Sequence, residues 1–240
     1  MNITVAMLIY KSPAYLDFVV NSLIEHPSKD HNVNYLIVCN DATVDVILQA
    51  EKWSRHPGVR HVVHENENPE DWWIQNVYNA WNRCLAETKT EAICFVNSDM
   101  AFTDEWLDAL AFYDLDKFIP TSKLVESGRM PSLPGLISKN FGQTLDDFNR
   151  KEFESFARGI SRPAVQFSCG AYMPSLFKTS TLKNIGGWRK NTGAPGGGII
   201  TPGDRITFGL LKDQGLRHVC VGDSIVYHFQ RGESAESGDL

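Results

Sequence analysis

The chain has few cysteines and little basic charge, which limits the classes of protein to which it can belong. Its five cysteines are scattered singly, without the CxxC pairs of a zinc site or the dense even spacing of a secreted disulfide framework. We therefore expect reduced thiols and a cytoplasmic location. Lys and Arg number 23 against 29 Asp and Glu, which gives a net charge of −6. The sequence has no basic run, so we expect no nucleic-acid partner.

Long apolar runs and a leader-like start are also missing from the sequence. No apolar stretch approaches the ~20 residues that a membrane helix needs. The first residues enter a strand-like run directly, without a basic region and a cleavage site. We therefore expect no transmembrane segment, while a peripheral membrane contact stays open.

What the sequence does contain is an alternation of apolar strands and amphipathic helices. Residues 3–9 form a continuous apolar run, as in a parallel strand buried on both faces, and Ser12-Pro13 then starts a helix. With 42% hydrophobic residues, the chain suits one α/β domain, 1–240, with a mostly parallel sheet whose ligands bind beyond the carboxyl ends of the strands. Further strands are expected at 35–39, 59–63 and 92–96, with helices at 44–53 and 71–87.

The second half of the chain has a weaker pattern. Residues 120–144 hold three prolines and three glycines and predict a loop-rich insertion, whereas residues 191–203, with five glycines and two prolines, predict a lid that a ligand orders. The other expected elements are helices at 104–112, within 145–156, from 175 and at 202–214, and strands at 115–119, 165–173, 217–221 and 224–229.

A carboxylate follows the apolar strand 92–96 within the segment Asn97-Ser98-Asp99. At the carboxyl edge of a sheet, Asp99 could hold Mg²⁺ or Mn²⁺ against a diphosphate, because hard cations prefer oxygen ligands. The alternative is that Asp99 only caps a turn.

Three further polar sites have the same ambiguity. Asn40-Asp41 ends the strand 35–39 and could bind a base or ribose, or could form an Asx-turn. Asp204 lies three residues after Thr201, which suits either a capping box or a general base beside the glycine-rich segment. His228 lies in the last expected strand, where it is either a core histidine or a metal ligand.

Taken in order, these segments resemble the family 2 glycosyltransferases of GT-A fold along nearly the whole chain. The resemblance implies a Rossmann-like, mostly parallel sheet flanked by helices, with a small antiparallel portion at the acceptor side. It also implies a nucleotide-binding half, 1–100, and an acceptor-binding half, 101–240. The segments that carry it are Asn40-Asp41-Ala42-Thr43, the stretch 76–85, Asn97-Ser98-Asp99, Gly186-Gly187-Trp188, Pro202-Gly203-Asp204 and Tyr227-His228.

The resemblance also implies a role for each site residue. Asp204 is the base that deprotonates the acceptor, Asp99 and His228 are metal ligands, and Gly187 and Trp188 shape the acceptor and sugar pocket. The residues implied to bind the nucleotide are Ile9, Tyr10, Lys11, Asn40, Asp41, Thr43, Asn76, Asn82, Asn97 and Ser98.

Three positions depart from the family pattern. Asn97 replaces the first aspartate of the metal motif, Asn40 replaces the first acidic turn residue, and Gly203 replaces the glutamate before the base. The family's C-terminal membrane helices and processive QxxRW motif are not found either. The departures leave the donor open and allow for a weakened enzyme.

The function implied is an inverting hexosyltransferase that uses Mn²⁺ or Mg²⁺. The donor would be a nucleotide-diphosphate sugar, with a UDP-sugar favoured, and the acceptor a hydroxyl of a glycan, a lipid-linked or a protein-linked molecule, as in polysaccharide biosynthesis. One alternative is a sugar-nucleotide nucleotidyltransferase, but residues 10–13 lack the Gly-rich, Lys/Arg-bearing loop of that class. The other is a non-catalytic binding relative, against which the retention of Asp99, Asp204 and His228 argues.

Overall fold

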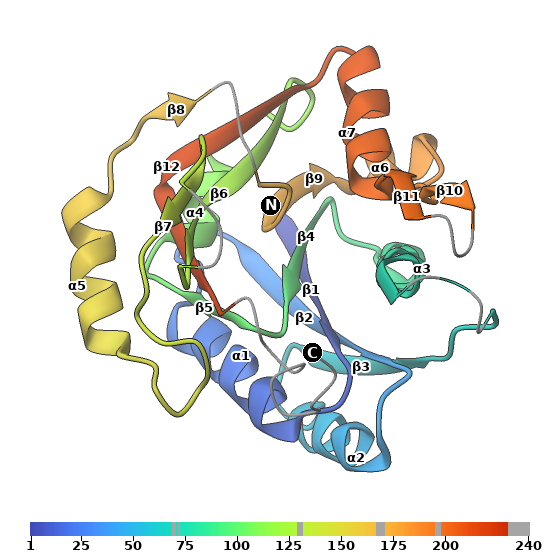
Figure 1. The fold of residues 1–240 in the computed structure, drawn as a ribbon, viewed down its shortest axis with the longest axis horizontal. Coiled ribbons are helices and arrows are strands. Elements are labelled where there is room, and N and C mark those ends of the chain that lie inside the picture. The colour runs from blue at the N-terminus through green and yellow to red at the C-terminus, as the bar shows by residue number, and fades with distance from the viewer. Residues whose placement is uncertain (69–70, 72, 129–131, 167–170, 195–197, 230–240) are drawn as a thin grey trace.

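The computed structural model of the protein describes residues 1–68, 71, 73–128, 132–166, 171–194 and 198–229 (Figure 1). The helices are α1 Pro13–Glu25, α2 Val44–Trp53, α3 Trp73–Glu87, α4 Trp106–Ala111, α5 Arg150–Ile160, α6 Thr179–Asn184 and α7 Gly203–Asp213. The strands are β1 Asn2–Ile9, β2 Asn32–Asn40, β3 Val59–His64, β4 Ala92–Asn97, β5 Met100–Phe102, β6 Phe118–Glu126, β7 Leu136–Ser138, β8 Val165–Gln166, β9 Ser175–Lys178, β10 Thr192–Ala194, β11 Gly198–Thr201 and β12 Arg217–His228.

One ten-stranded sheet contains all of these strands except β10 and β11, which pair with each other. Its main path runs β3-β2-β1-β4-β9-β6-β12-β5, with β7 paired to β6 and β8 paired to β12. Strands β1 to β4 are mutually parallel, and β9 is antiparallel to both β4 and β6. Because β12 is parallel to β6, the strands β4, β6 and β12 all point the same way. The expected α/β fold with a mostly parallel sheet and a small antiparallel portion is confirmed.

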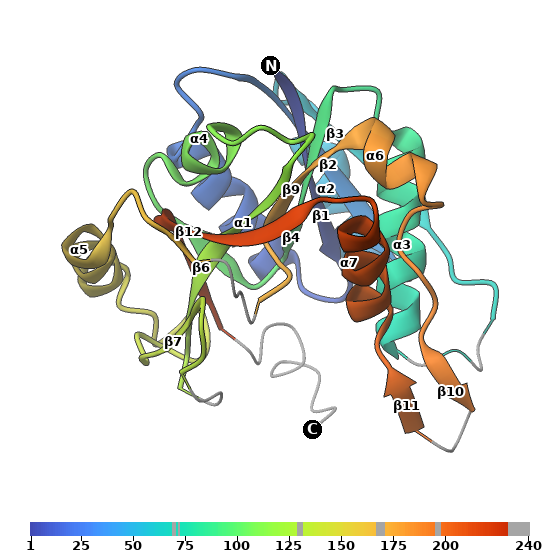
Figure 2. The same ribbon diagram turned by 90° about the horizontal axis from the view of Figure 1, so that it is seen from above.

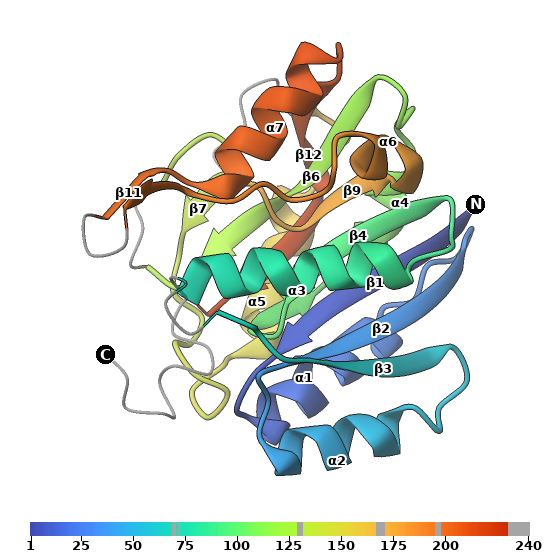
Figure 3. The same ribbon diagram turned by 90° about the vertical axis from the view of Figure 1, so that its right-hand side faces the viewer.

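Helices cover both faces of this sheet. Figures 1 and 3 show α1 and α2 on one face of the first four strands and α3 on the other, where α7 also lies. The order strand, helix, parallel strand requires this layering, because each crossover helix must pack back onto the sheet. Figure 2 shows β7 and the β10–β11 hairpin extending on either side of the sheet, toward its carboxyl edge.

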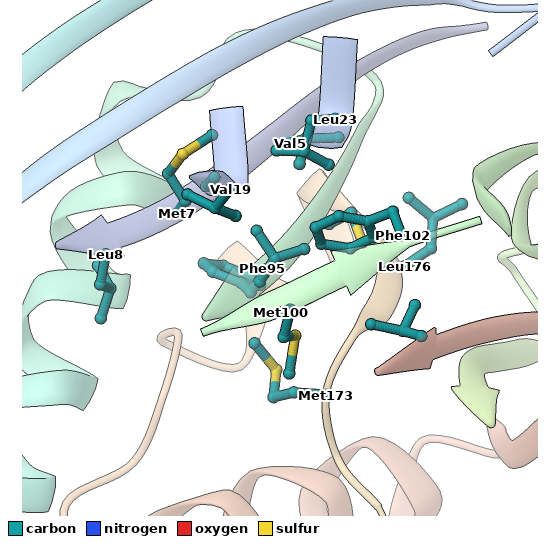
Figure 4. Packing of buried hydrophobic residues seen from close by; sticks show 14 of the residues in the cluster. Val5, Met7, Leu8, Val19, Leu23, Phe95, Met100, Phe102, Met173 and Leu176 are labelled. Atoms are coloured by element: carbon teal, nitrogen blue, oxygen red, sulfur yellow. The ribbon is translucent and has the colours of Figure 1, made fainter. Parts of the chain in front are cut away.

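Helix α1 illustrates how the sequence builds these layers. The Ser12 hydroxyl accepts a hydrogen bond from the backbone N–H of Tyr15, and Pro13 occupies the first helical turn, where its missing N–H costs nothing. One helical face is buried, and Figure 4 shows Val19 and Leu23 from that face beside Val5 and Met7 of β1. Leu8 points to the opposite side of the sheet, as the strand period of two requires (Figure 4).

Several elements of the second half differ from expectation. Strand β6 begins in the expected strand 115–119 but runs on to Glu126 in the expected loop-rich insertion, where β7 also lies. Residues 175–178 form a strand, and the helix expected from residue 175 begins only at Thr179. The expected strand 165–173 is described as β8 only at its first two residues, and residues 167–170 lie outside the described part.

Two further differences concern loops. Part of the expected lid is ordered as the antiparallel hairpin of β10 and β11, although residues 195–197 lie outside the described part of the chain. The two expected terminal strands are one strand, β12, whose register with β6 shifts between Val221 and Ile225. The segment 222–224 between these two residues is therefore a bulge inside a continuous strand.

Candidate functional site

Three strand ends meet at the carboxyl edge of the sheet. Asp99 follows β4, Glu126 ends β6 and His228 ends β12. Glu126 and His228 are register partners on neighbouring parallel strands, and the backbone N–H of Phe229 donates to the Asp99 carbonyl at 3.1 Å. The sheet topology therefore brings together residues that are separated by up to 129 positions, from 99 to 228.

These three residues form a carboxylate–imidazole cluster. His228 Nε2 lies 3.3 Å from Asp99 Oδ2, and His228 Nδ1 lies 3.1 Å from each oxygen of Glu126. The side chains are 14% exposed for Asp99, 7% for Glu126 and 20% for His228. His228 is therefore neither an apolar core residue nor a free surface group, because both ring nitrogens face a carboxylate.

The charge of the cluster follows from this geometry. Burial by itself lowers the pKa of His228, but Asp99 and then Glu126 attract and hydrogen-bond the protonated ring and raise that pKa to about 10. The imidazole is thus a cation at neutral pH when nothing else occupies the cluster. A group that binds Nε2 through its lone pair must displace a proton.

The residues of the cluster fit a hard divalent cation, although no group of three or more His, Cys, Asp or Glu in the described part of the chain is already arranged around a metal position. Two ligands about 2.1 Å from one octahedral cation lie about 3 Å apart. The 3.3 Å between Asp99 Oδ2 and His228 Nε2 is close to that separation. Glu126 then accepts from the other ring nitrogen, the usual arrangement that orients a metal-binding histidine.

A second polar cluster lies where β2 and β3 end. Asn40 and Asp41 both accept hydrogen bonds from the Asn66 side chain, at 2.8 Å and 2.6 Å, and Asp41 also accepts from the Asn66 backbone. Asn66 in turn accepts from Asn79 of α3. Asp41 adopts a left-handed conformation, with φ of 47°, that aspartate tolerates better than most residues. A cavity beside this network is lined by His64, Asn66, Asp71, Asn79, Arg83 and Lys190, among others.

The end of β1 offers one exposed ring. Tyr10 is 43% exposed, and Lys11 Nζ lies 4.7 Å from the centre of its ring. The Tyr10 carbonyl accepts from the backbone N–H of Thr43, which fixes β1 beside the start of α2. Ile9 is only 1% exposed, so it could contribute to a nucleotide site through its backbone and not through its side chain.

The asparagines expected to bind nucleotide have different surroundings. Asn82 accepts from the backbone N–H of Trp188 at 2.8 Å and donates to the Trp188 carbonyl at 2.9 Å, so both ends of its amide hold that turn. Asn76 Oδ1 is buried without a hydrogen-bond partner among the described residues. Asn97 and Ser98 are half-buried at the end of β4, next to Asp99.

Gly187 and Trp188 lie beneath the surface. A side chain at Gly187, whose φ is +78°, would collide with the Asn82 amide, so the glycine is required by backbone conformation and by space. Trp188 is 2% exposed within a cluster of rings, where it packs with Tyr78, Trp81, Phe95, Phe177 and Phe208. Trp188 could therefore shape a sugar pocket only through its packing in the core, and not by direct contact with the sugar.

Asp204 lies in the first turn of α7, directly after the hairpin. The helix N-cap is Pro202, with no side-chain cap, so the capping box considered as one alternative for Asp204 does not form. Burial raises the pKa of the Asp204 carboxyl, and the Arg205 backbone N–H and the Tyr78 hydroxyl partly offset this effect. Figure 3 shows the start of α7 on the side of the molecule where β1 and β4 end.

Sequence reasoning missed Glu126, Asn66 and Tyr78. Glu126 falls in the segment expected to be a loop, although Leu124 and Val125 before it carried a short apolar signal. Asn66 follows β3, as Asp41 follows β2, so a search for polar residues just after each strand could have found it. Tyr78 has the spacing of a core residue, and nothing in the sequence relates it to Asp204.

Comparisons with known proteins agree with this architecture. The family model described as glycosyl transferase family 2 matches residues 4–117. The mannosyltransferase PcManGT from Pyrobaculum calidifontis, in complex with GDP-Man and Mn²⁺, aligns with a TM-score of 0.60 at 15% identity over 98% of this chain and 59% of that one. S. aureus TarS 1-349 with UDP gives 0.60 at 16% identity, over 95% and 60%. GalNAc-T7 with UDP, GalNAc and Mn²⁺ gives 0.61 at 12% identity, over 95% and 44%.

The chain therefore has the GT-A fold, and its resemblance to the family 2 glycosyltransferases is confirmed. It spans about three fifths or less of the length of these three structures. No curated protein sequence matches the chain. Among the described helices, none combines the length and the apolar character needed to cross a membrane.

Proposed function

We propose that the protein is a nucleotide-sugar glycosyltransferase that moves a hexosyl group to a hydroxyl acceptor with inversion at the sugar carbon. The observation that carries this proposal is the cluster of Asp99, Glu126 and His228 at the carboxyl edge of a GT-A sheet. The neighbours PcManGT and GalNAc-T7 were solved with Mn²⁺ and a sugar or sugar nucleotide, which supports the same chemistry here.

In this proposal Asp99 and His228 hold Mn²⁺ or Mg²⁺, and Glu126 orients the imidazole. The cation supplies Lewis-acid neutralisation of the diphosphate that leaves the sugar. The chain's part is to keep Asp99 Oδ2 and His228 Nε2 at the spacing observed and to release the imidazole proton when the cation binds.

The donor's nucleoside would lie near the end of β1 and the Asn40–Asp41 network. The exposed Tyr10 ring gives a stacking surface, and the Asp41 carboxylate faces solvent while it holds Asn66. A UDP-sugar remains the favoured donor. The cytoplasmic location and the glycan or glycolipid acceptor also remain proposals from the sequence.

Asp204 would take the proton of the acceptor hydroxyl. Its carboxyl is half-buried, and burial raises its pKa, which makes the carboxylate a stronger base than an exposed aspartate. A base on the opposite side of the sugar carbon from the leaving diphosphate produces single displacement and inversion. Alignment of acceptor, sugar and base supplies a further part of the rate.

The test is a thermal-shift panel of UDP-, GDP-, TDP- and CMP-sugars with Mn²⁺ or with EDTA, followed by transfer assays with the donor that stabilises most. We expect one nucleotide class to raise Tm only with the cation, because a ligand that binds the native state stabilises it by mass action. Asp99→Asn should lose that cation-dependent rise, since an amide ligates a hard cation more weakly than a carboxylate.

A matched control is Asp116→Asn, which changes an exposed aspartate in an ion pair with Lys178, away from the cluster. It should keep the wild-type response. A cation-dependent rise of unchanged size in Asp99→Asn would remove Asp99 from the site, and no response to any donor would argue against the proposed function.

A further inference from the structure

The residue directly before Asp204 has no room for a side chain. A Cβ atom at Gly203 would collide with the Arg189 carbonyl oxygen and would lie 2.7 Å from Cε2 of Tyr78. The glycine φ is not in the left-handed region, so space and not backbone conformation requires a glycine here. The Tyr78 ring therefore fills the place that a side chain at position 203 would take.

Tyr78 is held rigidly in that place. It is 1% exposed, its ring is stacked parallel to Trp188 with centres 6.2 Å apart, and it contacts Trp81 at 5.7 Å. Its hydroxyl is buried and has no partner at ordinary hydrogen-bond geometry among the described residues. A buried hydroxyl without a partner is costly to a fold, and such a group calls for an explanation.

Asp204 is the acidic residue that affects the pKa of that hydroxyl. The backbone and the carboxylate of Asp204 both alter the pKa of Tyr78, which burial raises to about 12, and Tyr172 adds a weaker effect. In return the phenol lowers the pKa of Asp204 against the effect of burial, as does the Arg205 backbone N–H. The pKa values of Tyr78 in α3 and Asp204 in α7 are thus affected by each other, by the Arg205 N–H of α7 and by Tyr172 in the segment before β9.

Hydrogen bonds fix α3 to the start of α7 at the same point. Gln75, one turn before Tyr78 and 4% exposed, accepts from the backbone N–H of Asn191 at 3.0 Å. Asn191 Oδ1 then accepts from the backbone N–H of Gly203 at 2.9 Å. These bonds hold Gly203, and with it the start of α7, against the helix that carries Tyr78.

We propose that Tyr78 is a positioning residue for Asp204. The lack of a side chain at Gly203 lets the Tyr78 ring lie beside this base. The phenol donates to the carboxylate when the acceptor excludes water, and this fixes which carboxylate oxygen faces the acceptor hydroxyl. The inference rests on the proposed function, because it assigns Tyr78 a part in the action of Asp204 as a base.

Tyr78→Phe tests this inference, because it removes one hydroxyl and keeps the ring that packs on Trp188 and Gly203. We expect kcat to fall about tenfold, the size of one lost hydrogen bond to a charged group, with the donor KM unchanged. The acid limb of the kcat–pH profile should move to higher pH, since Asp204 loses a group that lowers its pKa. The Tm should change little, because the variant keeps the ring and its packing on Trp81 and Trp188.

Tyr35→Phe is the matched control. It removes a phenol hydroxyl from β2 that donates to the Leu23 carbonyl at 3.3 Å, and it should leave the acid limb unmoved. A second readout needs no activity: NMR titration of ¹³Cγ-labelled aspartate should show the Asp204 signal titrating at higher pH in Tyr78→Phe than in wild type.

The outcomes are distinct. Wild-type kcat, an unmoved acid limb and an unmoved Asp204 titration in Tyr78→Phe would overturn the inference alone, provided that Asp204→Asn is inactive. Full activity in Asp204→Asn would instead overturn the proposed base, and the positioning role with it.

Discussion

At the scale of single residues, the site depends on carboxylates whose neighbours set their chemistry. Asp99 and Glu126 hold His228 as a cation, whereas burial opposes the charge of Asp204, and the Tyr78 phenol and the Arg205 N–H partly offset that effect. Environments that differ in this way suit the two roles proposed above, a cation-binding cluster and a base. The sequence motifs identify Asp99, Asp204 and His228. They do not identify Glu126, which faces His228, or Tyr78, which affects the pKa of Asp204.

Asp204→Asn separates catalysis from stability. The amide cannot accept a proton, so transfer should fall by about 10²-fold or more, while binding of donor and Mn²⁺ persists. Because burial raises the folded-state pKa of Asp204 above its ordinary value, ionisation of this group opposes folding as pH rises through that pKa. Urea unfolding should therefore show a variant as stable as wild type or more stable at pH 7, with the difference vanishing below the ordinary aspartate pKa.

Full transfer activity in that variant, measured with the true acceptor, would contradict the assignment. Asp213, at the far end of α7, would then be the described carboxylate to test next; Glu233, the other candidate that the sequence offers, lies outside the described residues.

At the scale of elements, the start of α7 shows how packing dictates sequence. The first residue of the helix must be a glycine, because Tyr78 and the Arg189 carbonyl leave no space for a Cβ atom at position 203. Thr207 Oγ1 connects the helix to the segment at Arg189, since it donates to the Gly203 carbonyl and accepts from the Arg189 N–H. The glutamate that the family carries at position 203 would not fit here. The glycine at position 203 is thus required by packing.

Two glycines of α7 should respond oppositely to the same substitution. Gly203→Ala should destabilise the protein by about 1–3 kcal/mol through overpacking against α3 and should lower transfer activity. Gly209→Ala, in the same helix and with nothing within 4 Å of its Cβ position, should stabilise by about 0.5–1 kcal/mol through helix propensity. Denaturant midpoints of the two variants measure the contrast, and equal shifts would show that Gly203 is not constrained by packing.

Strand β6 shows why most of one strand, residues 120–126, was expected to be a loop. Thr121 and Ser122 are fully buried, so the strand lacks the apolar pattern by which buried strands are recognised. Their hydroxyls pair with Ser175 and Ser224 from other strands, which satisfies them inside the sheet. Such pairing depends on partners 54 and 102 residues away and leaves no local signal.

At the scale of the whole molecule, residues 1–100 and 101–240, the halves to which the resemblance assigns nucleotide and acceptor binding, share one sheet and one ring cluster. Strand β9 pairs with β4, and Phe95 of β4 contacts Phe177 of β9 and Trp188 beyond α6. The division at residue 100 is therefore a division of roles that we infer from the family resemblance, across a continuous hydrophobic core.

Phe95→Ala should accordingly destabilise both halves together. Phe95 is fully buried, so the loss should be about 3–5 kcal/mol, and far-UV circular dichroism and tryptophan fluorescence should still report one coincident transition. Phe112→Ala, which removes a ring that is 85% exposed, should change stability little. Two separated transitions in either protein would show that residues 1–100 fold independently.

The sequence alone determined the local part of this protein: the strands and helices of residues 1–97, the cap at Ser12, and the polar residues at the ends of β2, β4 and β12. These follow from periodicity and turn chemistry, which depend on neighbours along the chain. Only the tertiary structure decided that β12 pairs in parallel with β6, which places Glu126 beside His228, and that the Tyr78 ring packs against Gly203, next to Asp204. Those contacts depend on strand order and on the space left by a glycine, which are properties of the packed molecule and not of any segment of it.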